Sequence, residues 1–427
     1  MLGSPFTPRP GDPPAAPSGR VVEFDLMRGF GSRMAAAQVQ LSNGLLIAGS
    51  KAIGKTAVAR AAAGVLGGQS LRVAVVEWDD RQKAGAVLRR AMDDQSMRSF
   101  GAVARTQLGR LRSVLKGPSV SVGLKGPSVS SGLGLPRAPE AEIARNLVQA
   151  GEQARRTARP AVIVIDDLQK WSPREMRELC QGLADCARAD HPIGVVAFAS
   201  PAGEERLARA DEHGMFSSHR LGPLTPRQSA HVLEQTAAQR GVQFDPAALE
   251  GLVKFSQGHP RRLQLAAHEA WEAAPAGDRI DAAAADHGIA AATAQLDRGE
   301  HTRTWRQLTA PEQALTQTLA ARGGSEPRSL LSLQQHVPRP HREQLEQAVA
   351  GLVRKDVIQE LPGGRIAFND PGTEGWVLRN RPPAGTAGHM LESGPTRQIG
   401  SPATAATARI EPQPSSNNNR SHPAIER

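Results

Sequence analysis

The chain has 427 residues, of which 39% are hydrophobic and 22% charged, and its formal net charge at pH 7 is +10. This length allows two or three domains, each with its own hydrophobic core. No apolar run reaches the roughly 18–20 residues that a membrane-spanning helix needs, and the N-terminal stretch lacks the basic and apolar regions of a secretory signal peptide.

In chain order, residues 1–18 are rich in proline, glycine and alanine, and we expect them to be extended. Four short apolar runs then alternate with stretches of helical character: "LLIA" at 45–48, "LRVAVVEWDD" at 71–80, "AVIVIDDLQK" at 161–170 and "PIGVVAFAS" at 192–200. Such runs are typical of βα units whose parallel sheet is covered on both faces. The sequence therefore predicts an α/β core over residues 19–221.

A basic insert occupies residues 81–160, which hold 15 Lys and Arg against 5 Asp and Glu. It contains a repeat, "KGPSVSVGL" at 116–124 followed by "KGPSVSSGL" at 125–133, which predicts either a β-hairpin or a flexible loop. The excess of positive charge is either a solvated surface or a contact site for nucleic acid or another acidic partner.

Residues 222–298 have helical character. Gly241 and Gly258 stand where helix C-caps are expected, and Pro226 and Pro260 stand where the next helices begin. This pattern predicts a helical domain after the core.

The next segment, residues 299–380, contains two helical stretches followed by "QELPGGRIAF", which predicts a two-stranded hairpin turned by Pro-Gly-Gly. Helix, helix and hairpin is the order of a winged-helix domain. The remaining residues, 381–427, are of low complexity, and we expect a disordered tail.

The strongest motif is "GSKAIGKT" at residues 49–56, which fits the phosphate-binding pattern G-x-x-x-x-G-K-T between an apolar strand and an alanine-rich helix. The glycines let backbone amides approach a phosphate, the lysine reaches the β- and γ-phosphates, and the threonine hydroxyl binds Mg²⁺. Ala52 replaces a frequent glycine; a left-handed conformation there costs about 1 kcal/mol, which phosphate binding tolerates. The predicted nucleotide-binding residues are Gly49, Ser50, Lys51, Ala52, Ile53, Gly54, Lys55, Thr56 and Ala57.

An acidic motif, "VIVIDD", ends the third apolar run. We expect Asp166 to hold Mg²⁺ through water, together with Thr56. The next position, often glutamate in ATPases, would orient the attacking water, but Asp167 is one methylene shorter. A displacement of roughly 1 Å can cost about a hundredfold in rate, so we expect slow hydrolysis. The alternative role of Asp167 is a helix N-cap at the strand end.

These motifs, with "SPFTP", "GRVVE", "HRLGPLTPRQ" and "FSQGHPRRLQLAAHEAW", occur in an order that resembles the bacterial AAA+ ATPases of the origin-recognition type, often grouped with STAND-like ATPases. The resemblance covers about residues 4–380. It implies a P-loop core, a helical lid over residues 222–298, a winged-helix domain over residues 299–380, and ATP with Mg²⁺ as the bound groups.

Within this resemblance, Arg261 in "GHPR" matches the lid arginine that would touch the γ-phosphate, although a surface arginine on a first helical turn is the alternative. The sensor position at the end of the fourth strand falls on Ser200, where the family carries asparagine. Gly19 and Arg20 resemble the family's box near the adenine. The candidate arginine fingers, none in a distinctive motif, are Arg206, Arg209 and Arg220.

Two segments are candidates for DNA binding. In initiator-like relatives, an insertion at the place of residues 81–160 contacts DNA. The predicted winged-helix domain is the second candidate, but winged helices bind proteins as well, so both kinds of partner stay open. Its basic candidates are Arg339, His341, Arg342, Arg354, Lys355 and Arg365, and the acidic residues beside them are Glu343, Glu346 and Asp356.

The first hypothesis for the function is an ATP-dependent molecular switch with slow hydrolysis, in which bound ATP repositions the winged-helix domain. Its candidate catalytic residues are Lys55, Asp167 and Arg261. The second hypothesis is a DNA-binding helper ATPase for replication or transposition, and the third is a hydrolysis-deficient ATP-binding scaffold. The family also implies a protein partner or a homo-oligomer, and we expect no membrane partner.

The two cysteines, Cys180 and Cys186, lie six residues apart in a helical stretch. Their number and spacing exclude a disulfide framework and a cysteine zinc site. We expect free, buried thiols, as in a protein of the reducing cytoplasm.

Overall fold

The computed structural model describes residues 3–7, 19–36, 43–67, 71–77, 83–92, 141–274 and 278–382. The repeat at 116–133 and all but the first two residues of the predicted tail lie outside these ranges. Most of the extended segment 1–18 and the central part of the basic insert also lie outside them.

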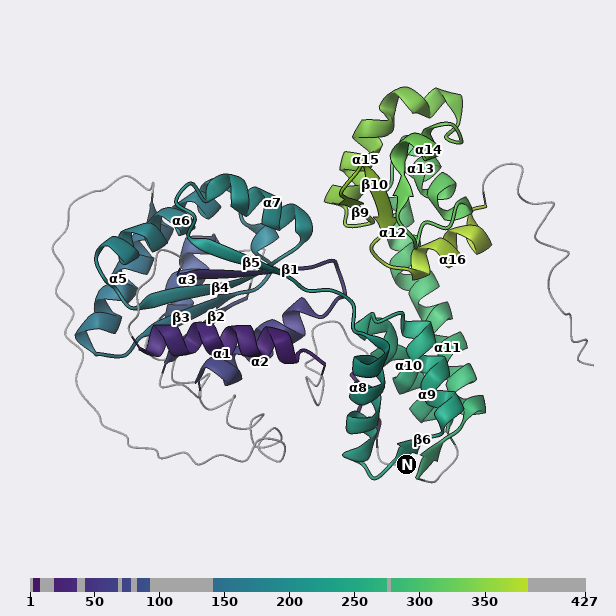
Figure 1. The fold of residues 1–427 in the computed structure, drawn as a ribbon, viewed down its shortest axis with the longest axis horizontal. Coiled ribbons are helices and arrows are strands. Elements are labelled where there is room, and N and C mark those ends of the chain that lie inside the picture. The colour runs from purple at the N-terminus through teal and green to yellow at the C-terminus, as the bar shows by residue number, and fades with distance from the viewer. Residues whose placement is uncertain are drawn as a thin grey trace, which may run out of the picture. The chain divides into compact units, whose positions relative to one another are not determined.

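The core contains a five-stranded parallel sheet in the order β2–β3–β4–β1–β5 (Figure 1). Its fifth strand has no counterpart among the predicted strands, because its sequence "FSSHR" is largely polar and its side chains are mostly exposed. A strand at the edge of the sheet tolerates this composition, since it pairs with β1 on one side only. The strands are β1 (Gly44–Ala48), β2 (Arg72–Val76), β3 (Ala161–Ile165), β4 (Ile193–Ala199) and β5 (Phe216–Arg220).

Helices cover both faces of the sheet, as the buried apolar runs predict (Figure 1). Along β4, Val196 and Phe198 pack into the cluster with α1 and α2, whereas Val195 and Ala197 pack into the cluster with α3, α5, α6 and α7. The alternation follows from the two-residue period of a strand. The helices are α1 (Val21–Ala35), α2 (Lys55–Gly67), α3 (Ala84–Met92), α5 (Glu142–Arg156), α6 (Pro173–Arg188) and α7 (Pro201–Ala210).

The helical lid domain follows the core. Pro226 and Pro260 each occupy the first residue of a helix, as predicted. The C-caps are Gln239 and Gln257 rather than the glycines, and Gly241 and Gly258 follow them with φ values of 71° and 76°. One apolar cluster joins the lid helices and includes Phe6 from the N-terminal segment. The lid elements are α8 (Pro226–Ala238), β6 (Gln243–Phe244), α9 (Pro246–Ser256), α10 (Pro260–Ala273), β7 (Arg279–Ile280) and α11 (Ala282–Leu296).

A π-helical turn, η2 (Asp297–His301), continues α11 directly into the next helix. We call residues 302–380 the C-terminal unit. It has its own apolar cluster and a three-stranded sheet in the order β8–β10–β9, in which β9 and β10 form the predicted hairpin. The order of its elements agrees with a winged-helix domain, which stays a prediction. They are α12 (Thr302–Arg306), α13 (Ala310–Ala321), β8 (Arg328–Ser329), α14 (Leu330–Gln334), η3 (Arg339–Gln344), α15 (Leu345–Arg354), β9 (Ile358–Leu361), β10 (Arg365–Phe368) and α16 (Gly372–Asn380).

The described part of the chain contains no helix that is both long and apolar enough to cross a bilayer. Both cysteines are buried and free, as expected. Burial raises the pKa of each thiol to about 12, because an apolar environment disfavours the thiolate.

Candidate nucleotide-binding site

The loop between β1 and α2 has the backbone of a phosphate-binding loop. Ala52 has a φ of 64° and Gly54 a φ of 98°, so the left-handed conformation considered for Ala52 is present. Gly49 has no room for a side chain, because a Cβ atom there would lie 2.9 Å from Cγ2 of Ile53. These positions follow directly from the spacing of the motif, and α2 begins at Lys55.

The side chain of Lys55 folds back over the loop. Its Nζ donates to the carbonyl oxygens of Gly49 at 2.7 Å and Ser50 at 2.8 Å. Burial lowers the pKa of Lys55, and three nearby carboxylates, that of Asp356 first, act in the opposite direction. The ammonium group of Lys55 therefore lies near carboxylates from other segments, and the loop itself contains no acidic residue to pair with it.

At the carboxyl end of β3, Asp166 is buried and hydrogen-bonds with Thr56, the second residue of α2. Burial raises the pKa of Asp166, and the bond to Thr56 opposes that shift. Parallel strands bring their carboxyl ends to one edge of the sheet, which is why residues over 100 positions apart in sequence meet here. The pair offers a hydroxyl and a carboxylate, which are the ligands that Mg²⁺ accepts.

Asp167 lies at the site's edge, with a φ of 55°. It is the N-cap residue of the short 3-10 helix that follows it, as in the alternative of an N-cap, but its side chain makes no capping hydrogen bond. Instead, its Oδ1 accepts from Nε2 of Gln169 at 2.7 Å, and its Oδ2 lies 3.1 Å from Nζ of Lys170. The carboxylate is held by residues of the short 3-10 helix that follows it, η1 (Leu168–Lys170).

The first turn of α10 faces the loop, since a Cβ atom on Gly54 would lie 3.7 Å from Cγ of Pro260. The next residue, Arg261, is largely buried and forms a 2.5 Å ion pair with Glu300 of η2. Its Nε and Nη1 atoms are buried and make no hydrogen bond within the described residues. This partial burial disfavours the alternative of a plain surface arginine, and two buried nitrogens without a partner are typical of a side chain that binds an anion.

A strand order of β2–β3–β4–β1–β5, a phosphate-binding loop after β1 and an acidic residue after β3 together define one fold class. Residues 30–196 match the family model described as AAA ATPase domain. The core of the chain therefore has the P-loop AAA+ fold that the sequence predicts. No curated protein sequence matches the chain.

Several solved structures match the chain at low sequence identity. A Walker-type ATPase of Pyrococcus abyssi is 15% identical with a TM-score of 0.49, over 81% of this chain and 94% of that one. The Orc1 protein of Aeropyrum pernix, solved in complex with DNA, is 15% identical with a TM-score of 0.43, over 86% and 94% of the two chains. The Thermotoga maritima RuvB Holliday junction branch migration motor is 15% identical with a TM-score of 0.40, over 81% and 91%.

The remaining candidates of the AAA ATPase domain have partners within the chain. Ser200 is the N-cap of α7, and its hydroxyl accepts from the backbone N–H of Gly203 at 3.2 Å. Arg206 donates to the carbonyl oxygens of Gln169 and Trp171. The other two candidate arginine fingers also form ion pairs on the described surface, Arg209 with Glu205 and Arg220 with Glu204.

Arg20 connects the nucleotide loop with the start of the lid. Its guanidinium donates to the carbonyl oxygen of Ile53 at 2.8 Å and to that of Gly222 at 2.7 Å. Burial lowers the pKa of Arg20, and Glu23, 3.7 Å away, opposes the shift. The resemblance places Arg20 near the adenine, and the geometry adds a bond between the loop and the core–lid boundary.

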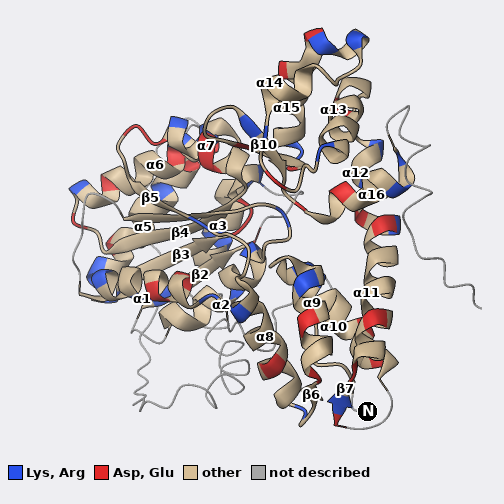
Figure 2. Ribbon diagram, turned by 45° about the vertical axis from the view of Figure 1, so that its right-hand side comes forward, with Lys and Arg blue, Asp and Glu red and all other residues tan. Residues whose placement is uncertain are grey.

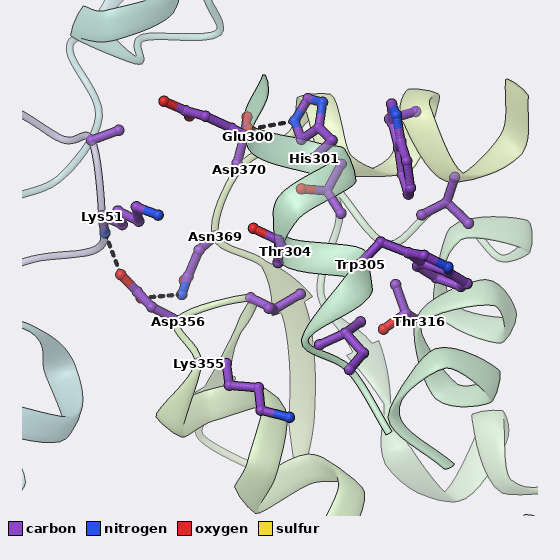
Figure 3. A pocket seen from close by; sticks show the side chains of 16 residues that line it. Lys51, Glu300, His301, Thr304, Trp305, Thr316, Lys355, Asp356, Asn369 and Asp370 are labelled. Carbon is purple, nitrogen blue, oxygen red and sulfur yellow. Dashed lines mark hydrogen bonds and ion pairs between the residues drawn. The ribbon is translucent and has the colours of Figure 1, made fainter. Parts of the chain in front are cut away.

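The C-terminal unit contributes an acidic residue to the loop. The backbone N–H of Lys51 donates to Oδ2 of Asp356 at 2.5 Å, and Nδ2 of Asn369 donates to Oδ1 of the same carboxylate at 2.6 Å (Figure 3). Burial raises the pKa of Asp356, and the charge of Lys55 is the largest effect that opposes it. The sequence indicates only that Asp356 lies beside basic residues, because no local signal relates it to a loop 305 residues away.

A second group of charges ties the C-terminal unit to the lid. His301 of η2 hydrogen-bonds with Asp370 at 2.9 Å (Figure 3). It also hydrogen-bonds with Asp297 at 3.1 Å. Arg262 of α10 also lies near Asp370, at 3.5 Å. Burial lowers the pKa of His301, but the bonds to both aspartates outweigh it and hold the pKa above its ordinary value.

Proposed function

We propose that the protein is an ATP-binding molecular switch of the AAA+ class, in which bound ATP releases the C-terminal unit from the nucleotide loop. The observation that carries the proposal is the hydrogen bond from the backbone N–H of Lys51 to the carboxylate of Asp356. We call the arrangement with this contact the closed arrangement.

The residues of the loop fit a nucleoside triphosphate with Mg²⁺. The left-handed residues Ala52 and Gly54 turn the loop so that backbone N–H groups and the N-terminus of α2 can meet a phosphate. Lys55 would contact the β- and γ-phosphates, and Thr56 with Asp166 would hold the metal ion. When bound, the ion would neutralise charge on the phosphates. The free N–H groups of Arg261 would meet the terminal phosphate from the lid side.

The closed arrangement and bound ATP compete for the same place. The carboxylate of Asp356 is an anion at an amide of the phosphate-binding loop and the strongest opposite charge acting on Lys55. A triphosphate carries several negative charges, so its entry beside that carboxylate is repulsive until Asp356 moves away. ATP therefore binds the open arrangement more tightly, which is the differential affinity that a switch requires.

The lid offers a second point of competition. Glu300 pairs with Arg261 at 2.5 Å and lines the same pocket as Lys51 and Asp356. A phosphate that recruits Arg261 must displace this carboxylate, which belongs to the π-helical turn leading to the C-terminal unit. The two contacts that ATP would break are thus one between the nucleotide loop and the C-terminal unit and one between the lid and the turn that leads to that unit.

Hydrogen exchange in the full chain, with and without ATP and Mg²⁺, tests the switch. ATP is expected to slow exchange of the loop 49–56 and to accelerate exchange around Asp356, since the two segments part. The Lys55→Ala variant should show neither change. The proposal is wrong if ATP protects both segments together, or if ATP binds without altering the segment around Asp356.

We further propose that hydrolysis is slow and resets the switch, with Asp167 orienting the attacking water. Turnover of the wild type and of Asp167→Glu, each compared with Lys55→Ala, tests this step. A faster Glu variant supports a short catalytic carboxylate. Turnover equal to Lys55→Ala in both, with ATP still bound, would instead make the protein an ATP-binding scaffold.

DNA binding is the second candidate function, favoured by the 15 Lys and Arg against 5 Asp and Glu in residues 81–160. In the described part of this insert, Arg89 and Arg156 already pair with Glu142 and Glu152, and Figure 2 shows acidic residues among the basic ones on the core helices. Three basic residues of the C-terminal unit bond within it: Arg342, Lys355 and Arg365. We therefore assign any DNA contact to the insert and a protein partner to the C-terminal unit.

A salt titration of duplex DNA binding separates these possibilities. Affinity that falls steeply with salt, and that drops when Lys83, Arg89 and Arg90 are replaced by alanine, supports the DNA function. No binding at low salt eliminates it. The matched control replaces three exposed lid arginines, Arg227, Arg240 and Arg279.

Location and assembly also belong to the proposal. Two free, buried cysteines are the composition of a protein kept in the reducing cytoplasm. Assembly with other copies would need an arginine from a neighbour, and Arg209 and Arg220 are exposed enough to serve, once each leaves its glutamate.

A further inference from the structure

The side chain of Gln169 connects two parts of the candidate site. Its Nε2 donates to Oδ1 of Asp167 at 2.7 Å, and its Oε1 accepts from the backbone N–H of Ser200 at 3.1 Å. Ser200 is the first residue after β4, and Asp167 is the second residue after β3. One amide therefore joins the ends of two neighbouring strands at the edge of the sheet where the nucleotide loop lies.

The two partners determine how the amide is oriented. A carboxylate can accept only, so it faces the NH₂ group, and a backbone N–H can donate only, so it faces the oxygen. Glutamate in this place would keep the acceptor and lose the donor, and leucine would lose both. Glutamine is thus the side chain of this length that satisfies both neighbours.

The backbone around Gln169 is fixed on both sides. The preceding Leu168 and the nearby Trp171 are buried in the core cluster. Arg206 of α7 donates to the carbonyl oxygen of Gln169 at 2.8 Å and also to that of Trp171. Gly203 of α7 lets this helix pack closely against Gln169, because a Cβ atom at residue 203 would lie 2.8 Å from Cβ of Gln169. These contacts hold the backbone of Gln169 in place and therefore restrict where its side chain can lie.

We propose that Gln169 is a positioning residue that sets the carboxylate of Asp167 for nucleotide hydrolysis. The inference rests on the proposed role of Asp167 in orienting the attacking water. It assigns to Gln169 the polar connection with the end of β4 that the resemblance places on Ser200, whose hydroxyl is engaged as the cap of α7. Lys170, 3.1 Å from the other carboxylate oxygen, completes the support.

Steady-state turnover and ATP affinity of the full chain test the proposal. Gln169→Leu is expected to lower kcat by about 10- to 100-fold, the range for a misplaced catalytic group, while the Kd for ATP stays within about twofold. Gln169→Glu should behave in the same way, since it keeps the acceptor but cannot donate to Asp167. The matched control is Gln181→Leu, which removes a 2.9 Å glutamine–aspartate bond on α6 and should leave kcat unchanged.

A double-mutant cycle distinguishes positioning from a general structural effect. In an Asp167→Asn background, Gln169→Leu should lower kcat by less than about twofold, because the group that it positions is already gone. Loss of kcat in both backgrounds by the same factor, or an ATP affinity that falls with kcat, overturns the proposal.

Turnover of the wild type distinguishes an absence of hydrolysis from a wrong assignment of Gln169. If wild-type turnover equals that of Lys55→Ala, hydrolysis itself is absent and the inference falls with it. If the wild type turns over and Gln169→Leu matches it, the inference alone is wrong.

Discussion

Replacing Asp356 by asparagine tests the competition at the nucleotide loop. The Asp356 side chain accepts a hydrogen bond from the backbone N–H of Lys51 at 2.5 Å. Asp356 itself has a φ of 57°. Asparagine tolerates this left-handed backbone and has nearly the same shape, so the variant removes the negative charge and leaves one accepting oxygen for the two donors, Lys51 and Asn369. A control for charge alone is Glu360→Gln, since Glu360 is an exposed residue of β9 in the same unit.

The size of the effect follows from the contact. Hydrogen bonds to charged groups contribute about 1.5–3 kcal/mol, against about 0.5–1.5 kcal/mol for neutral ones, so the contact between the exposed Lys51 and the half-buried Asp356 should lose about 1–1.5 kcal/mol. That is about five- to tenfold in the ratio of closed to open molecules. While the closed arrangement dominates, the apparent Kd for ATP falls by the same factor.

Isothermal titration of ATP with Mg²⁺ into the full chain measures this Kd directly. Asp356→Asn is expected to bind ATP about five- to tenfold more tightly than the wild type, and Glu360→Gln about equally. An unchanged or weaker affinity in Asp356→Asn would refute the reasoning. Equal tightening by both variants would mean that long-range charge, rather than the contact, is responsible.

Three further predictions concern stability and reactivity. The pKa of His301 is raised, so its contribution to the free energy of unfolding is full below about pH 6.5 and declines as pH rises through the raised value; urea titrations should show a larger loss for His301→Gln at pH 6 than at pH 8.5, and the opposite order would contradict this. The thiols of Cys180 and Cys186, with pKa values raised to about 12, should react with a thiol reagent at pH 8 only after unfolding, and rapid labelling of the native protein would contradict their burial. Gly288→Ala should destabilise the protein by at least about 2 kcal/mol in urea, because its Cβ would lie 2.5 Å from backbone atoms of α10, whereas Gly299→Ala, with open space around it, should cost less than about 1 kcal/mol.

The parts of the fold that rest on short-range patterns are predictable from the sequence. Short buried apolar runs identify β1 to β4, and prolines identify the starts of α8 and α10. The glycine pattern of the loop gives its backbone, including the left-handed Ala52. In each case the signal lies within a few residues of the structure that it specifies.

The rest depends on contacts between distant residues. The polar edge strand β5 is stabilised by pairing with β1 rather than by its own composition. Asp356 contacts the nucleotide loop, and Glu300 pairs with Arg261. No local sequence pattern relates either acidic residue to its partner. Gln169 lies in the motif "VIVIDDLQK", yet its hydrogen bond to the backbone of Ser200 depends on β4 ending beside it.

The π-helical turn between the lid and the C-terminal unit has a consequence for insertions and deletions. Because α11, η2 and α12 follow one another without a loop, each residue in this run sets the rotational phase of everything after it. Removing one residue from Asp297–His301 would turn the following helix by about 100° and shift it by about 1.5 Å. Such a deletion would carry Asp356 away from Lys51 without touching either residue, so the length of this junction is as much a determinant of the closed arrangement as the contact itself.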